Sequence, residues 1–157
     1  MTKDELKSYI AGHFADKLTL LESGKFDPMY ETKAASLLEV AKALHDDPQL
    51  TFDFMCNLGG VDTGEHLEVV YNIASTTTKL RLDFKFSLPY ENPEVDSVCS
   101  VWPGAKWYER EMWELYGINV RNHTELERFL LPDDWNQGTP MLKKWEGGPD
   151  FVRMPEL

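Results

Sequence analysis

The chain has 157 residues, and 42% of them are hydrophobic, which fits one compact domain with its own core. Asp and Glu outnumber Lys and Arg by 27 to 16, so the net charge is −11 and no basic surface is available for nucleic acid. No apolar run approaches the roughly 20 residues that cross a bilayer, and the charged N-terminus differs from a signal peptide. We therefore expect a soluble, cytoplasmic protein that neither binds nucleic acid nor inserts into a membrane.

Helical periodicity dominates the first part of the chain. Thr2 precedes Glu5 by three positions, which is the spacing of a capping box and predicts the start of a helix. The helix is expected to end near Lys17, and His13 is expected to be a hydrogen-bonded core histidine on its apolar side. This stripe consists of Leu6, Tyr9, Ile10, His13 and Phe14.

A short hairpin and a second helix are expected next. Residues 18–21 and 28–31 are predicted to pair as two short strands around a Ser-Gly-Lys turn. The apolar residues between 33 and 46 share one helical face, and the Asp-Pro pair that follows closes the helix. This face consists of Ala34, Leu37, Leu38, Ala41 and Leu44.

The pattern then switches to the alternation that is typical of strands. Apolar residues recur at every second position in 50–58, 67–73 and 79–88, so that Phe54 and Cys56 are expected to face inward. Two glycines after the first segment are expected to turn the chain. One apolar and one polar face per strand predicts an antiparallel meander, which the helices cover on one face in a two-layer α+β fold.

A third helix and an irregular tail complete the predicted elements. The helix runs from about 104 to Tyr116, Gly117 supplies a left-handed cap, and a short strand follows. Glycine and proline are frequent near the C-terminus, which argues against regular structure there. We therefore expect a single α+β domain over residues 1–135 and an extended C-terminal arm over residues 136–157.

Patterns of metal ligands, nucleophiles and cofactor loops are scarce. The two cysteines, Cys56 and Cys99, are too few to hold an iron–sulfur cluster and are expected to be free buried thiols. The four histidines show no metal-ligand spacing. Gly59 and Gly60 lead into no helix N-terminus that would bind phosphate. The sequence therefore predicts no catalytic, cofactor-binding or metal-binding residue in this chain.

The final third of the chain contains all five tryptophans. On the helix between Trp107 and Tyr116, the charged residues Arg110, Glu111 and Glu114 lie opposite the apolar arc. One interpretation is a solvated face with a weak pair between Arg110 and Glu114. The enrichment in Trp, Tyr and Arg favours a protein interface instead. Acid–base catalysis by the two carboxylates is disfavoured, because no partner group is apparent.

The region from 102 to 135 resembles the signature of the 30-kDa subunit of respiratory complex I, which is the C subunit of bacterial NADH:quinone oxidoreductase. Glu127 and the run from 139 to 145 depart from the usual pattern, which leaves the particular complex open. The similarity lies in Trp-Pro-Gly-Ala-Lys-Trp-Tyr-Glu-Arg-Glu from Trp102, Glu-Leu-Tyr-Gly-Ile from Glu114, His123, Arg128, and Leu-Pro-Asp-Asp-Trp from Leu131.

The resemblance implies a cofactor-free structural subunit of the hydrophilic arm, in a complex that transfers electrons from NADH to quinone and couples this transfer to ion translocation. FMN, iron–sulfur clusters and quinone would be bound by other subunits. The partners would be the subunit that forms the quinone cavity and the subunit that carries the terminal iron–sulfur cluster. The chain would lie peripherally on the cytoplasmic side of the inner membrane.

The resemblance also implies that the aromatic and charged residues contact other subunits. Arg110, Glu111 and Glu114 would form buried ion pairs between subunits, so that Arg110→Ala would reduce assembly with little effect on the isolated chain. The residues expected at the interface are Trp102, Trp107, Glu109, Arg110, Glu111, Glu114, His123, Arg128, Asp133, Asp134, Trp135 and Trp145.

Two other functions stay open on the sequence alone. The same module is similar to a subunit of membrane-bound energy-converting nickel–iron hydrogenases and formate hydrogenlyases, and a free-standing protein-binding module is an alternative of another class. The arm also has two interpretations, because its apolar residues either order on a neighbouring subunit or fold back over the chain's own sheet. These residues are Met141, Leu142, Trp145, Phe151, Val152 and Met154.

Overall fold

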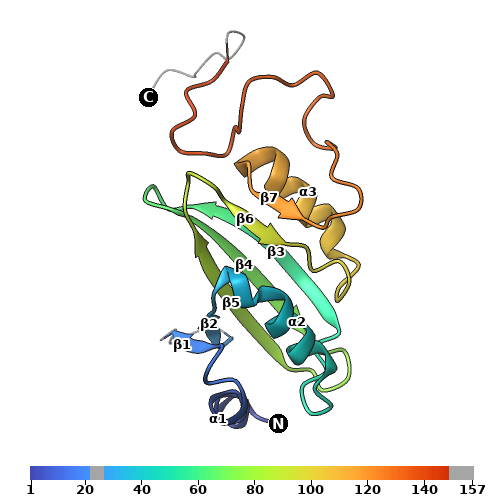
Figure 1. Cartoon of the computed structure of the whole chain (residues 1–157). Coiled ribbons are helices and arrows are strands. Elements are labelled where there is room, and N and C mark those ends of the chain that lie inside the picture. The colour runs from blue at the N-terminus through green and yellow to red at the C-terminus, as the bar shows by residue number, and fades with distance from the viewer. Residues whose placement is uncertain (22–26, 149–157) are drawn as a thin grey trace, which may run out of the picture.

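A five-stranded sheet, a two-stranded sheet and three α-helices are arranged as Figure 1 shows. The computed structural model describes residues 1–21 and 27–148, and these elements are those of the described residues. Within the same residues, no helix is both long and apolar enough to cross a bilayer.

The first helix, α1 (Lys3–His13), begins with the predicted capping box. Thr2 Oγ1 accepts a hydrogen bond from the Glu5 N–H at 3.2 Å, and the Glu5 carboxylate accepts one from the Thr2 N–H at 2.7 Å. The helix ends earlier than predicted. His13 is exposed and its ring stacks on the Tyr9 ring, with the centroids 4.1 Å apart. The prediction of a core histidine was wrong, because His13 lies at the edge of the buried stripe.

The central sheet has the strand order β1-β2-β5-β4-β3. The strands β3 (Phe54–Asp62), β4 (Leu67–Ala74) and β5 (Arg81–Leu88) form the predicted antiparallel meander. The strands β1 (Thr19–Leu21) and β2 (Met29–Glu31) form the predicted antiparallel pair, and the predicted turn at Ser23-Gly24-Lys25 lies outside the described residues. The sheet also contains a parallel pair between β2 and β5 that was not predicted, because nothing local in the sequence sets it.

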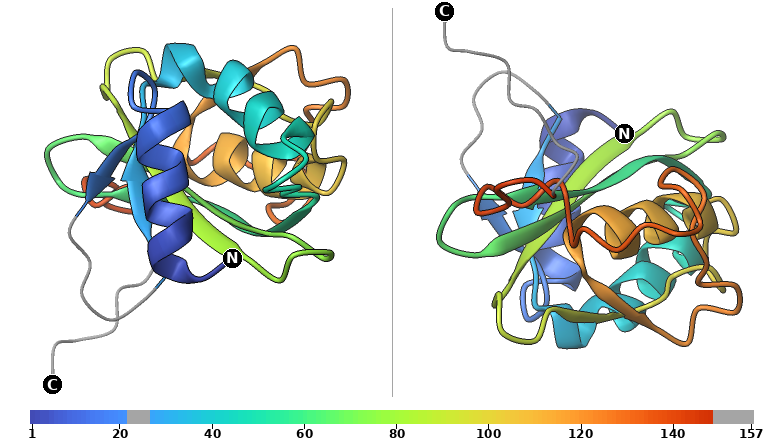
Figure 2. Two further views of the ribbon diagram at one scale, coloured as in Figure 1. Left: turned by 90° about the horizontal axis from the view of Figure 1, so that it is seen from below. Right: turned by 90° about the horizontal axis from the view of Figure 1, so that it is seen from above.

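The helices cover one face of this sheet. The helix α2 (Leu37–Asp46) continues from a 3-10 turn, η1 (Ala34–Ser36), and lies on the same side as α3 (Ala105–Tyr116), as Figure 2 shows. Strands β4 and β5 alternate between buried positions and more exposed ones. The uncovered face carries polar groups, including an ion pair of Glu68 and Lys85 at 2.8 Å. The two-layer α+β fold is thus confirmed.

The inward face of β3 differs from the prediction. A β-bulge between Met55 and Asn57 shifts the alternation of the strand. As a result Phe54 is 53% exposed and Met55 is buried. Cys56 is an exposed free thiol, so the prediction that it is buried was wrong.

The glycine pair after the bulge does not turn the chain as predicted, because Gly59 and Gly60 both lie within β3. A Cβ atom at Gly60 would lie 3.0 Å from the Tyr116 ring. Gly60 therefore allows α3 to approach the sheet closely. The turn comes later, where Gly64 adopts a φ of +95°.

A small parallel sheet flanks α3 in the sequence. It consists of β6 (Glu94–Asp96) and β7 (Asn119–Arg121), of which only the second was predicted. Gly117 ends α3 with a φ of +73°, as predicted. Beyond β7, residues 122–148 form turns and loops, which run over the end of the molecule where α3 lies (Figure 1).

Candidate functional site

The helix α3 carries the charged residues that the sequence singles out, and three of them are buried. Glu109 is 1% exposed, and Arg110 and Glu114 are each 4% exposed. A buried charge is costly unless hydrogen bonds satisfy it. These three side chains therefore form neither a solvated face nor a surface that is free to pair with another subunit.

Arg110 binds the loop that follows β7. Its Nε donates to the carbonyl oxygen of Glu127 at 2.7 Å, and a terminal nitrogen donates to the carbonyl oxygen of Arg128 at 2.8 Å. Its guanidinium carbon lies 4.8 Å from the ring centroid of Trp107 and 4.9 Å from that of Phe129. Arg110 thus holds two aromatic rings and the loop backbone in one arrangement.

Glu114 holds the next residues of the same loop. Its carboxylate accepts backbone hydrogen bonds from Leu130 at 2.9 Å and from Phe129 and Leu131 at 3.3 Å each. A carboxylate that accepts several N–H groups is well satisfied without a cation. Glu114 therefore binds the loop, and the weak pair with Arg110 that one interpretation of the sequence allowed is not formed among the described residues.

A second group of polar side chains surrounds Glu109. The Ser97 hydroxyl and the Cys99 thiol donate to its Oε2 at 2.7 and 3.2 Å. The Val98 N–H donates to its Oε1 at 2.7 Å. The side chain of His123 is fully buried, and its Nε2 lies 3.9 Å from Oε2 of Glu109. Three separate segments of the chain meet in this cluster.

Cys99 is the partly exposed member of this cluster. Burial raises the pKa of Cys99 to about 11; the Ser97 hydrogen bond opposes this rise, and the negative charge of Glu109 adds to it. The protonated thiol can therefore donate its hydrogen bond to Glu109 at neutral pH. No short-spacing motif could have found this group, because its members are separated along the chain and only the fold brings them together.

The tryptophans expected at the interface have different environments. Trp102 is a core residue that is 2% exposed, and its indole N–H donates to the Phe52 carbonyl oxygen at 2.8 Å. Trp135 and Trp145 are partly exposed, and their indole N–H groups donate to tail carbonyl oxygens at 2.7 and 2.6 Å. The remaining residues of the predicted interface keep exposed or partly exposed surface, and they are Glu111, Arg128, Asp133 and Asp134.

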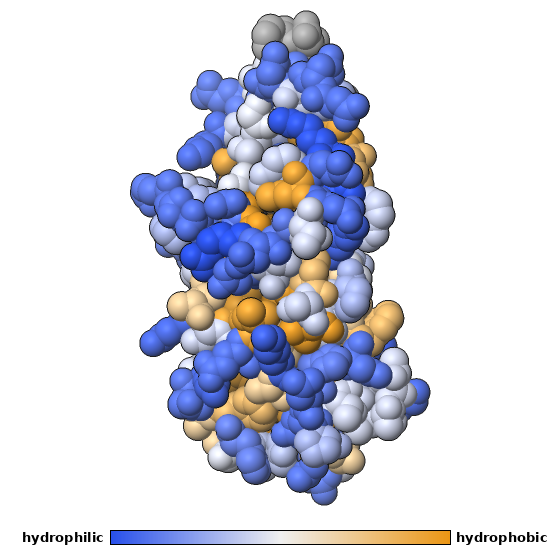
Figure 3. Space-filling model, turned by 45° about the vertical axis from the view of Figure 1, so that its right-hand side comes forward, coloured by the Kyte–Doolittle hydropathy of each residue, from blue (hydrophilic) through white to orange (hydrophobic). Residues whose placement is uncertain are grey.

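An exposed apolar patch lies beside the buried guanidinium of Arg110. We call it the aromatic patch and define it as Trp107, Phe129 and Leu130. These residues are 55%, 37% and 54% exposed, and the two rings meet edge-on with centroids 5.5 Å apart. Figure 3 shows one face of the molecule, where hydrophobic residues reach the surface among hydrophilic ones. Sequence reasoning missed Phe129 and Leu130, because the loop has no periodicity. The interface assignment stays a prediction, and the patch is the surface on which it now depends.

The described part of the C-terminal arm contacts the chain's own fold. The Met141 N–H donates to the Leu115 carbonyl oxygen at 3.1 Å, and the Lys143 N–H donates to the Asp62 carboxylate at 2.7 Å. Lys143 Nζ also donates to the Thr63 carbonyl oxygen at 3.1 Å. The predicted apolar residues at 151, 152 and 154 lie outside the described residues, so the boundary at 135 and binding of the arm to a partner stay predictions.

We expect acidification to release the arm at Asp62. Burial alone would raise the pKa of Asp62, but hydrogen bonds from the Tyr90 hydroxyl and from the N–H groups of Lys143 and Gly64 lower the pKa below its ordinary value. The stabilisation is therefore complete above about pH 4 and is lost as the pH falls through the lowered pKa. Hydrogen exchange of the Lys143 amide, corrected for its intrinsic pH dependence, measures this loss.

The control for this expectation is Asp62→Asn. Its amide cannot carry the negative charge, so the Lys143 amide should exchange faster at pH 7 and show no further step at acidic pH. Equal protection of the amide in the variant and the unaltered chain at pH 7 would show that Asp62 does not hold the arm.

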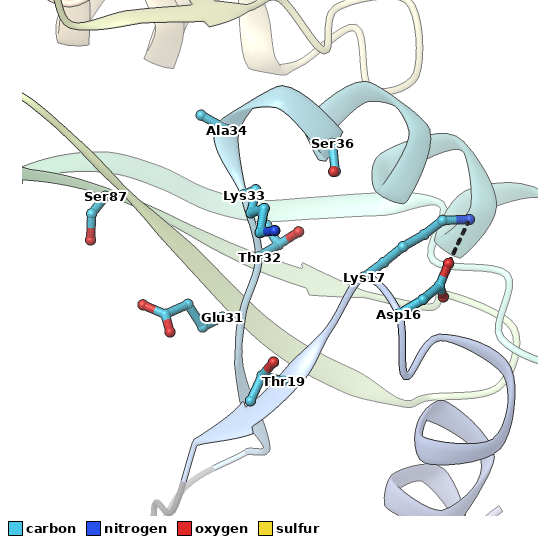
Figure 4. Close-up of a pocket in the computed structure, with 9 residues that line it drawn as sticks. All are labelled: Asp16, Lys17, Thr19, Glu31, Thr32, Lys33, Ala34, Ser36 and Ser87. Carbon is cyan, nitrogen blue, oxygen red and sulfur yellow. Dashed lines mark ion pairs between the residues drawn. The ribbon is translucent and has the colours of Figure 1, made fainter.

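A polar cleft of about 390 Å³ lies near β1 and η1 (Figure 4). Its lining includes Asp16, Lys17, Glu31 and Lys33. Lys17 Nζ lies 3.9 Å from the Asp16 carboxylate. The acidic and basic side chains balance one another, so the cleft favours neither an anion nor a cation, and we assign it no chemistry.

Two curated proteins to which the chain is similar belong to oxidoreductase complexes. The C subunit of NADH-quinone oxidoreductase from Roseiflexus sp. (strain RS-1) is 42% identical over 119 residues, which are 74% of this chain and 68% of that protein. The C subunit of F(420)H(2) dehydrogenase from Methanosarcina mazei is 47% identical over 103 residues, which are 64% of this chain and 65% of that protein. The chain thus aligns with about two thirds of each relative.

Solved structures confirm the fold, and a family model identifies the family of the chain. The trypsin-resistant fragment 1–134 of Nqo5 has a TM-score of 0.66 at 21% identity, covering 77% of this chain and 98% of the fragment. A chain of the membrane-bound sulfane sulfur reductase, an archaeal respiratory membrane complex, has a TM-score of 0.71 at 18% identity, covering 83% and 77%. The model of the 30-kDa subunit of respiratory-chain NADH dehydrogenase matches residues 30–150. This match spans most of the chain, which therefore belongs to the 30-kDa subunit family of respiratory-chain NADH dehydrogenase.

Proposed function

We propose that this chain is a structural subunit, free of redox cofactors, of the hydrophilic arm of a complex of the NADH:quinone oxidoreductase type, where it supports the quinone-reducing module. The main observation in support of this proposal is that buried Arg110 and Glu114 both bind the loop that contains Phe129 and Leu130 of the aromatic patch. Charges used in this way position a contact surface and are not available as an acid, base or nucleophile. The names of the two relatives, each the C subunit of an oxidoreductase, support the same role.

The proposal assigns the redox chemistry to other subunits. FMN, iron–sulfur clusters and quinone would be held there, while electrons pass from the donor to quinone with coupled ion translocation. The proposed neighbours are the subunit that forms the quinone cavity and the subunit that carries the terminal iron–sulfur cluster. The chain would lie peripherally on the cytoplasmic side of the inner membrane through these contacts.

The aromatic patch is the proposed contact surface. Two of its residues, Trp107 and Leu130, are more than half exposed although they are large and apolar, and exposed apolar groups that cluster in this way are typical of protein interfaces. Glu127, whose side chain is 71% exposed, lies beside the patch with its carboxylate 3.6 Å from a guanidinium nitrogen of Arg110, and its outer surface faces solvent. A partner with apolar side chains bordered by lysine or arginine would fit this surface.

The electron donor is the open part of the proposal, because the two relatives are named for different donors. Isolation of the complex through an affinity tag on this chain would identify the electron donor. Co-purified subunits that oxidise NADH support the main proposal, and subunits that oxidise F(420)H(2) assign the other donor. A nickel-bearing subunit would indicate a hydrogenase, and recovery of the chain without any oxidoreductase subunit would contradict the proposal.

We expect Leu130→Glu to lower recovery of the assembled complex about tenfold or more, because a charge in an apolar contact costs over ~1.4 kcal/mol of binding free energy. The melting temperature of the isolated chain should change little, since the side chain is 54% exposed. The measurement is the yield of complex through a tag on a partner subunit.

The matched control is Leu20→Glu, which places the same charge on another exposed leucine, 46% exposed, on β1. This strand forms the edge of the sheet opposite to β3. Equal losses of complex from both variants would show that added charge alone disturbs assembly, and no loss from Leu130→Glu would remove the patch from the interface.

A further inference from the structure

Cys99, Glu109 and His123 bring together three kinds of metal-ligating atom. The thiol sulfur, a carboxylate oxygen and an imidazole nitrogen all lie within 4.8 Å of one another. Cys99 Sγ is 3.2 Å from Oε2 of Glu109, and His123 Nε2 is 3.9 Å from the same oxygen. Tetrahedral zinc with ordinary bond lengths places such atoms roughly 3.3–3.6 Å apart, so each of these two distances needs to change by only a few tenths of an ångström.

The charge of this cluster favours a cation. Glu109 is 1% exposed, and the groups that donate to it are a hydroxyl, a backbone N–H and a thiol. None of these carries a positive charge, and the adjacent Arg110 binds the loop backbone instead. These hydrogen bonds satisfy the carboxylate as the loop amides satisfy Glu114, and a divalent ion would add the positive charge that the donors lack.

A second observation comes from Tyr71, a fully buried residue of β4. Its hydroxyl has no hydrogen-bond partner among the described residues. Burial, followed by the negative charges of Glu109 and Cys99, raises the pKa of Tyr71 well above its ordinary value.

We propose that Cys99, Glu109 and His123 form a binding site for a zinc-class divalent transition metal. The mixture of sulfur, nitrogen and oxygen ligands suits such an ion, whereas calcium and magnesium prefer oxygen ligands alone. Three protein ligands leave a fourth position for water or for the Ser97 hydroxyl. The partly exposed Cys99 provides the route of entry.

Binding shifts protons but involves no redox step. The Cys99 thiol releases its proton to solvent and bonds the metal as a thiolate. His123 Nε2–H donates to the Lys106 carbonyl oxygen at 3.1 Å, and its Nδ1 accepts from the Glu125 N–H at 3.1 Å. To bond the metal through Nε2, the imidazole loses its Nε2 proton to solvent and takes one up on Nδ1. The hydrogen bonds to Lys106 and Glu125 are both broken, and the bond to the metal replaces them.

Cobalt(II) titration of the full chain tests the site without any redox assay. The unaltered chain should show a thiolate-to-cobalt charge-transfer band in the near ultraviolet, and zinc should abolish it by displacement. Cys99→Ser should lose the band, while Cys56→Ser should keep it, because Cys56 is an exposed thiol on another element. Serine preserves the size and a hydrogen-bond donor, and circular dichroism verifies that both variants fold.

Zinc should also raise the melting temperature of the unaltered chain and of Cys56→Ser but not of Cys99→Ser. Absence of the charge-transfer band in the unaltered chain would overturn the proposal, as would a band that persists in Cys99→Ser and disappears in Cys56→Ser. The result is independent of the proposed structural role, since it requires no partner subunit.

Discussion

Replacement of Arg110 by alanine is expected to lower the free energy of unfolding of the isolated chain by about 3–6 kcal/mol, since each of two lost charge-assisted hydrogen bonds is worth about 1.5–3 kcal/mol. The side chain is 4% exposed and donates to the carbonyl oxygens of Glu127 and Arg128. Alanine would also remove the guanidinium that packs against the rings of Trp107 and Phe129. This expectation reverses the one from the sequence, in which the same substitution acted mainly on assembly.

Urea unfolding of the full chain measures the effect through the transition midpoint. Arg110→Lys should lie between alanine and the unaltered chain, because lysine keeps the charge but lacks the planar fork that binds two carbonyls and stacks on rings. The matched control is Arg121→Ala. The Arg121 side chain is 50% exposed and pairs with Asp96 at 3.1 Å, so its loss should cost at most about 1 kcal/mol. Equal losses of unfolding free energy in both alanine variants would contradict the structural role of Arg110.

Local signals in the sequence predicted the regular elements well. The capping box at Thr2, the alternation in β4 and β5, and the glycine cap at Gly117 each depend on neighbours within a few residues. The parallel pairing of β2 with β5 joins segments that are far apart, so no local pattern encodes it. The bulge beside Cys56 changes the inward face without changing the period that the sequence displays.

The structure changes the environment expected for the charged residues of α3, while their place in an interface stays a prediction. The charged arc of α3 is visible in the sequence, and a charged arc is ordinarily solvated. What buries Arg110 and Glu114 is the loop from 127 to 131, which has no periodicity and is itself fixed by these two side chains. The burial and the loop conformation depend on each other, so neither could be inferred from the sequence before the other was known.

Replacement of Glu114 by glutamine is the second large expected effect. The carboxylate accepts N–H groups from Phe129, Leu130 and Leu131, whereas a glutamine side chain has one oxygen and turns an NH₂ donor toward the other donors. Hydrogen bonds to a charged group are worth about 1.5–3 kcal/mol each, and two of these three are long, so we expect a loss of about 2–3 kcal/mol. The amides of the three loop residues should exchange faster with solvent.

The matched control is Glu111→Gln on the same helix, where the side chain is partly exposed and binds no loop amide among the described residues. Its effect on unfolding should be within about 0.5 kcal/mol. Equal stability losses from the two glutamine variants, or unchanged exchange of the three amides in Glu114→Gln, would contradict the assigned role of Glu114.

The two largest effects should also be coupled. Arg110 and Glu114 bind adjacent parts of one loop. Once one substitution has released this loop, the second substitution removes less stabilising free energy than it would alone. The double variant, Arg110→Ala with Glu114→Gln, should therefore lose at least about 0.5–1 kcal/mol less than the sum of the single losses, in line with measured couplings between neighbours. Because the loop presents Phe129 and Leu130, Glu114→Gln should also lower the recovery of the complex although Glu114 itself is buried. Strictly additive losses would mean that the two side chains stabilise separate parts of the chain, and the aromatic patch would then lack a common support.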